Sequence, residues 1–161
     1  MAVIRVESLR DRPAWVPVLA LWAYYEWSIP MRRGWEATVD RYRPTDDLLP
    51  VTFVASLDGA PAGMASLRTT DSHDFLPGVS PWICNVYVAP GARGQGVAAR
   101  LCESLIDAAH RMGFADLHLA AGMKSGSLYH RLGFTNVAEV EYFGPRHVLR
   151  LDLTAPQERS K

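Results

Sequence analysis

The stretch ICNVYVAPGARGQGVAARL, residues 83–101, predicts a strand, a glycine-rich turn and a helix in direct succession. Its first residues are mostly apolar, β-branched or aromatic, as in a buried strand, and the residues from Val97 onward are good helix formers. Because glycines let the backbone approach a ligand closely, Gly94 and Gly96 would turn main-chain N–H groups and the positive end of the helix dipole toward an anion. The stretch therefore predicts a phosphate site built from main chain, with Arg93 as a cation beside it.

Composition places the chain among globular proteins. Its 161 residues are 48% hydrophobic and 21% charged, which suits one domain with a core of its own. Lysine and arginine together number 17, as do aspartate and glutamate, so no net positive field favours nucleic acid or an anionic membrane. We therefore expect neither nucleic acid nor a membrane as a partner.

The cysteines and the N-terminal residues bear on the compartment. The chain has two cysteines, Cys84 in the predicted strand and Cys102 in the predicted helix, and we expect both to be buried and reduced. Cysteines and histidines lack the spacing of metal ligands, so no metal is expected. Residues 1–12 lack the apolar segment of a leader, and no stretch approaches the ~20 apolar residues of a membrane span. These features favour a cytoplasmic protein.

Hydrophobic periodicity and turn residues predict a mixed α/β domain over residues 1–154, followed by a flexible tail over residues 155–161. Strands are expected at residues 3–7, 51–57, 62–69, 83–88, 115–119, 135–143 and 147–153. Helices are expected at residues 14–28, 35–43, 97–111 and 125–132. In the first helix the spacing of Trp15, Leu19 and Trp22 predicts that these three side chains face the sheet.

The glycine turn is open to several interpretations. A P-loop would need Gly-Lys-Ser/Thr at its end, but Gly96 is followed by Val97 and Ala98, which excludes this motif. The spacing Gly94-x-Gly96-x-x-Ala99 fits a dinucleotide fingerprint, yet that fingerprint follows the first strand of a domain, and more than half of this chain precedes it. A pyrophosphate site for coenzyme A meets no such conflict. A glycine-rich helix start without any ligand is the remaining alternative.

Two segments resemble the GNAT acetyltransferase superfamily. Residues 88–98, VAPGARGQGVA, resemble its acetyl-CoA signature, and residues 128–134, LYHRLGF, resemble its LYxxLGF segment. The resemblance implies a single α/β (α+β) domain with a mixed, mostly antiparallel sheet of six to seven strands, flanked by about four helices and splayed between the fourth and fifth strands. It also implies acetyl-CoA as co-substrate. Where many members carry an asparagine before the tyrosine, this chain has Gly122.

The resemblance implies roles for particular residues. The main chain of the fourth strand would pair with the pantetheine arm, and one of its N–H groups would polarise the thioester carbonyl: Val86, Tyr87 and Val88. Main-chain N–H groups of the turn would hold the pyrophosphate: Arg93, Gly94, Gln95, Gly96, Val97 and Ala98. Tyr129 would act as general acid toward the departing thiolate, because a tyrosine pKa near ~10 keeps the hydroxyl protonated at neutral pH.

The acceptor amine needs a base, because a primary amine is mostly protonated near neutral pH. The start of the fourth strand offers no good base, which leaves His73, Asp74 and Asp71 in the preceding loop as weak candidates. We expect aromatic and acidic side chains from three segments to wall the acceptor cleft: Tyr25, Glu26, Trp27, Trp82 and Glu141.

Together these observations predict an N-acetyltransferase that moves an acetyl group from acetyl-CoA directly to an amine of a small molecule, a peptide or a protein. A non-catalytic acyl-CoA-binding sensor of the same fold is the alternative. The sequence leaves open the acceptor, the acyl length and whether the chain forms a homodimer.

Overall fold

A seven-stranded sheet in the order β1-β2-β3-β4-β5-β7-β6 organises the fold. The computed structural model describes residues 2–71, 73–122 and 126–154. Neighbouring strands run antiparallel except β4 and β5, which are parallel, so the predicted mixed and mostly antiparallel sheet is confirmed. The strands are β1 (Ile4–Ser8), β2 (Val51–Leu57), β3 (Ala60–Arg68), β4 (Trp82–Val88), β5 (Asp116–Gly122), β6 (Thr135–Glu141) and β7 (Pro145–Asp152).

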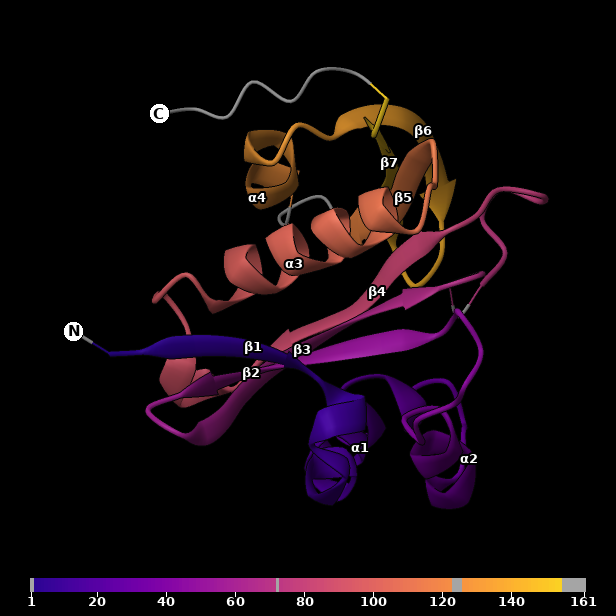
Figure 1. Cartoon of the computed structure of the whole chain (residues 1–161). Coiled ribbons are helices and arrows are strands. Elements are labelled where there is room, and N and C mark those ends of the chain that lie inside the picture. The colour runs from indigo at the N-terminus through magenta and orange to yellow at the C-terminus, as the bar shows by residue number, and fades with distance from the viewer. Residues whose placement is uncertain (1, 72, 123–125, 155–161) are drawn as a thin grey trace.

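Helices cover both faces of this sheet, with α1 and α2 on one side and α3 and α4 on the other (Figure 1). The helix expected over residues 14–28 is present as successive 3-10, α and π segments, and the other predicted helices end within a few residues of their expected bounds. The described helices are all too short or too polar to cross a membrane. Residues 125 and 155–161, which include the predicted tail, lie outside the described residues. The α-helices are α1 (Val16–Ala23), α2 (Trp35–Asp40), α3 (Val97–Arg111) and α4 (Gly126–Arg131).

The larger core lies between α3 and the sheet. The apolar side chains Val97, Leu101 and Leu105 follow one another at helical spacing along α3 and are buried against the strands. Gly63 in β3 permits this close packing, because a Cβ at this position would lie 2.7 Å from the main-chain oxygen of Tyr87 and 3.0 Å from Val97 Cγ1. The absence of a side chain at Gly63 thus brings α3 down onto the strands that carry the glycine turn.

A second core lies under α1. Leu19 is fully buried beside Met64, while Trp15 and Trp22 are partly buried, so the predicted inward face of this helix is confirmed. The Trp22 ring lies against the ring of Tyr87, with centroids 5.3 Å apart. The Tyr87 side chain therefore belongs to the α1 side of β4.

β4 and β5 separate toward their carboxyl ends, as the family resemblance implies. Between β4 and β5 the register consists of one pair of residues, Trp82 and His118, among the described residues. By contrast, β5 pairs with β7 along its whole length. In β4 a bulge places two residues, Asn85 and Val86, opposite Ala65 of β3, and Asn85 has a φ of 55°. Because β4 bends away here, main-chain groups that would otherwise join the sheet face a gap.

Candidate active site

A cavity of about 530 Å³ fills the gap between β4 and β5. Its floor is formed by residues 83–86 of β4, which include the bulge, and residues 119–122 of β5. Aromatic and charged side chains from other segments complete the wall, and this volume and mixed lining are typical of a small-molecule site. The side chains that complete the wall include Glu26, Trp27, Asp71, Phe75, Tyr129, Tyr142 and Arg146.

A second cavity of about 380 Å³ lies at the glycine turn. Val88, the end of β4, lines it, whereas Val86 lines the first cavity. In α4, Tyr129 lines the first cavity while Leu128 and Arg131 line the second. Neighbouring positions of the same two elements therefore line the two cavities, so the cavities lie close to each other at the end of β4.

The glycine turn has the geometry of an anion site. Gly94 and Gly96 have φ values of 75° and 85°, which residues with a Cβ adopt only with strain. In the described part of the chain, no carbonyl or side chain accepts a hydrogen bond from the main-chain N–H groups of residues 94–99. These donors sit at the positive end of a 15-residue helix and have room for a diphosphate.

Arg93 is held beside this turn. Its Nε donates a hydrogen bond to the Val88 carbonyl at 3.0 Å, and its guanidinium carbon lies 5.9 Å from the centre of the Tyr87 ring. Arg131 adds a second positive charge to the lining of the same cavity. Two arginines and the helix dipole therefore favour a polyanion over a neutral ligand.

Tyr129 lines the first cavity. The residue is 9% exposed and its ring packs edge-on against Phe134, with centroids 6.2 Å apart. Burial raises the pKa of Tyr129 above its ordinary value, because the charged form would lose its hydration. The hydroxyl is thus a neutral proton donor at the wall of the cavity over the whole physiological pH range.

The structure separates the candidate bases. Asp71 lines the cavity, whereas His73 and Asp74 are exposed and do not line it. The His73 ring instead stacks on Tyr142, with centroids 4.7 Å apart. Glu26, predicted for the cleft, brings a second carboxylate to the same wall.

The other residues expected at the acceptor cleft divide in two groups. Trp27 lines the cavity, while Tyr25 is 69% exposed and Glu141 is also exposed, both away from the lining. Trp82 is 1% exposed and does not line the cavity, because its Nε1 donates to the Val79 carbonyl at 2.8 Å and its ring packs against His118. The structure thus places Trp82 in the core at the contact between β4 and β5.

The sequence does not assign several residues of the cavity lining to the site, among them Phe75, Tyr142 and Arg146. The last two flank the turn between β6 and β7, which the sequence predicts only as a connection. What brings them to the cavity is the sheet order, since β7 is inserted between β5 and β6 and its first residues lie opposite the end of β5. No local feature of the sequence predicts that β7 lies between β5 and β6.

Both cysteines are buried, and burial raises the pKa of Cys84 and of Cys102 to about 12. Within the described residues no three histidine, cysteine or acidic side chains group as metal ligands. We expect neither thiol of the native protein to react with an aromatic disulfide reagent at pH 8 within minutes, because only about one thiol in 10⁴ would be ionised. Unfolding in guanidinium should release both, as measured by absorbance. Rapid reaction of one thiol in the native protein would contradict this burial.

Comparisons with known proteins agree with this geometry. The model of the acetyltransferase (GNAT) family matches residues 18–134. A curated relative, the L-methionine sulfoximine/L-methionine sulfone acetyltransferase of Salmonella typhimurium, is 38% identical over 79 residues. That match covers 45% of this chain and 44% of the relative, so the chain matches less than half the length of that protein.

Solved structures share the fold along nearly the whole chain. The yncA acetyltransferase of Salmonella typhimurium, solved with its cofactor acetyl-CoA, superposes with a TM-score of 0.69 at 24% identity, over 98% of this chain and 99% of that one. An aminoglycoside 6'-N-acetyltransferase complexed with coenzyme A gives a TM-score of 0.70 at 12% identity, over 96% and 99% of the two chains. At these identities the likeness concerns the fold.

Proposed function

Because this chain belongs to the acetyltransferase (GNAT) family, we propose that it transfers an acetyl group from acetyl-CoA directly to the amine of a small molecule. The observation that carries the proposal is the run of main-chain N–H groups at residues 94–99, which have no acceptor in the part of the chain that the structure describes. This run lies next to a sheet that opens between β4 and β5. A curated relative named for two methionine derivatives supports a small acceptor.

The residues present fit coenzyme A in two places. The N–H groups of residues 94–99 would hold the diphosphate, with Arg93 and Arg131 neutralising its charge. The pantetheine arm would follow the exposed main chain of Val86–Val88 into the larger cavity. Acetyl-CoA supplies the reactive thioester, and an N–H group at the β4 bulge would polarise its carbonyl.

Side chains of the larger cavity would move the protons of the reaction. The carboxylate of Asp71 or Glu26, directly or through water, takes a proton from the acceptor ammonium so that the nitrogen lone pair can attack the carbonyl carbon. As the carbon–sulfur bond breaks, Tyr129 would donate its hydroxyl proton to the sulfur. The second proton that the nitrogen loses on forming the amide would return, through water, to the Tyr129 oxygen. The raised pKa of Tyr129 keeps the hydroxyl proton available, which favours an enzyme over a sensor that only binds acyl-CoA.

A thiol-release assay with acetyl-CoA and a panel of small amines tests this function. We expect coenzyme A to appear only when an acceptor amine is present, with the N-acetylated product detected by mass spectrometry. Coenzyme A affinity, measured by calorimetry, is the companion measurement. Tight coenzyme A binding without transfer to any amine would favour the sensor, and absence of coenzyme A binding would refute the cofactor site.

A further inference from the structure

The acceptor end of the larger cavity carries charges of both signs. Glu26 and Asp71 bring carboxylates, and Arg146 brings a guanidinium group. Arg146 is the Cα partner of Gly122, and paired residues of neighbouring strands point to the same face of a sheet. That face is opposite to the α3 side, where Leu119 and Ala121 of β5 pack into the larger core. Arg146 therefore approaches the cavity from the side of Glu26 and Trp27.

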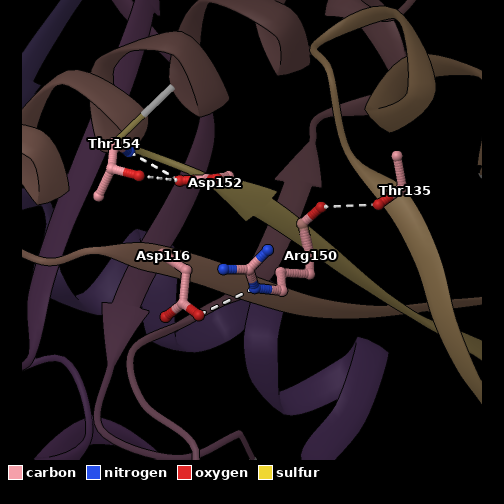
Figure 2. A network of polar contacts seen from close by, with 5 residues as sticks. All are labelled: Asp116, Thr135, Arg150, Asp152 and Thr154. Carbon is pink, nitrogen blue, oxygen red and sulfur yellow. Dashed lines mark hydrogen bonds and ion pairs between the residues drawn. The ribbon is translucent and has the colours of Figure 1, made fainter. Parts of the chain in front are cut away.

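Arg146 is held in place but lacks an anionic partner among the described residues. Its Nε donates to the Tyr142 carbonyl at 2.7 Å, and its side chain is partly buried. None of the ion pairs among the described residues involves Arg146. By contrast, Arg150 on the same strand is paired with Asp116 at 2.9 Å (Figure 2). A partly buried arginine that lines a cavity without a carboxylate partner is a ready receptor for an anion.

Gly122, the cross-strand partner of Arg146, leaves open space at the end of β5. A Cβ placed on Gly122 would meet no atom of the described residues within 4 Å. This glycine therefore leaves room on the face of the sheet to which Arg146 also points. The two remaining nitrogens of the fork suit the two oxygens of a carboxylate.

The proposed binding of the coenzyme A diphosphate does not account for the positive charge of Arg146. The proposed diphosphate site is lined by Arg93 and Arg131 and belongs to the cavity at the glycine turn. Arg146 lines the other cavity, where the thioester and the acceptor would meet. The positive charge is thus on the acceptor's side of the reaction.

Resting on the proposed function, we propose that the acceptor is an amino acid with a free carboxylate, which Arg146 binds. Glu26 and Asp71 attract its ammonium group, so the two ends of the molecule are held by opposite charges. Trp27, Phe75 and Tyr142 add aromatic surface to the wall, which favours an acceptor with an uncharged side chain. The cavity therefore selects zwitterionic amino acids over simple amines and polyamines.

Matched pairs of acceptors test this assignment: L-methionine sulfone, L-leucine and L-phenylalanine, each beside its carboxamide. The carboxamide keeps the amine but lacks the anion, so we expect a kcat/KM for the acids at least about 10-fold higher. Arg146→Gln should lower kcat/KM for the acids about 10- to 100-fold, mainly through KM, and change the carboxamides less than about twofold. Arg146→Lys should restore part of the loss, because it keeps the charge but not the fork.

Arg150→Gln is the matched control, since it removes an arginine of the same strand that is already paired outside the cavity. We expect it to leave the preference for acids unchanged. Equal rates for acids and carboxamides in the native protein, or an equal loss for both in Arg146→Gln, would overturn the proposal.

Calorimetry with L-methionine sulfone and the coenzyme A-loaded protein separates this proposal from the proposed function. Binding that depends on Arg146 supports the carboxylate site even if no amine is acetylated. Acetylation of neutral amines that is indifferent to Arg146 would keep the proposed function and refute the carboxylate site. Binding of the amino acid that is unchanged in Arg146→Gln would likewise refute the site.

Discussion

Gly96→Val is expected to weaken coenzyme A binding by at least about 100-fold and to abolish acetyl transfer at ordinary cofactor concentrations. Gly96 precedes α3 with a φ of 85° and lines the cavity at the glycine turn. A β-branched side chain would project from a position that the diphosphate needs, and its strain would turn neighbouring N–H groups away. Loss of two charge-assisted hydrogen bonds, each about 1.5–3 kcal/mol, accounts for an effect of this size. Calorimetric titration with coenzyme A measures it.

Gly113→Val is the control for backbone strain. Gly113 follows the other end of α3 with the same φ of 85°. A Cβ there would meet no atom of residues 2–71, 73–122 or 126–154 within 4 Å, as at Gly96. Both variants should lose about 1–2 kcal/mol of stability from the left-handed backbone. Only Gly96→Val should lose affinity for coenzyme A. Native affinity in Gly96→Val would show that the diphosphate lies elsewhere.

The part of the site that the sequence could predict is local. Residues 83–101 contain a strand, a turn and a helix in order, so the donors of the glycine turn follow from their spacing alone. Tyr129 could be placed because it belongs to a short segment with a family resemblance, although its burial could not be read from that segment. These features depend on neighbours in the chain, which a sequence displays directly.

The lining of the larger cavity depends on which strands pair with each other, and this pairing cannot be read directly from the sequence. Trp82 resembles a cleft residue in an aromatic, proline-rich stretch, but its hydrogen bond to Val79 and the parallel contact with His118 hold it in the core. Arg146 gives no signal in the sequence and reaches the cavity only because β7 pairs with β5. Long-range pairing, and not local propensity, therefore decides which side chains line the larger cavity.

Tyr129→Phe is expected to lower kcat about 100-fold or more, with little change in coenzyme A affinity. The substitution removes a hydroxyl group at the cavity wall and keeps the ring that packs against Phe134. General acid groups accelerate reactions about 10²- to 10⁴-fold. In Tyr129→Phe the sulfur would leave as an unprotonated thiolate, so the reaction would lose this acceleration. Because burial raises the pKa of Tyr129, the native kcat should not fall through ionisation of this group up to pH 10. Steady-state rates across pH, beside calorimetry, measure both effects.

Tyr42→Phe supplies the matched comparison. Tyr42 is 2% exposed, its pKa is also raised by burial, and its buried hydroxyl has no hydrogen-bond partner among the described residues. It lies in the smaller core and does not line the larger cavity. Loss of this hydroxyl should leave the rate unchanged and stability equal or higher, since an unsatisfied polar group is removed. If both variants slowed turnover alike, the effect of Tyr129→Phe would reflect packing, and another group would have to protonate the leaving sulfur.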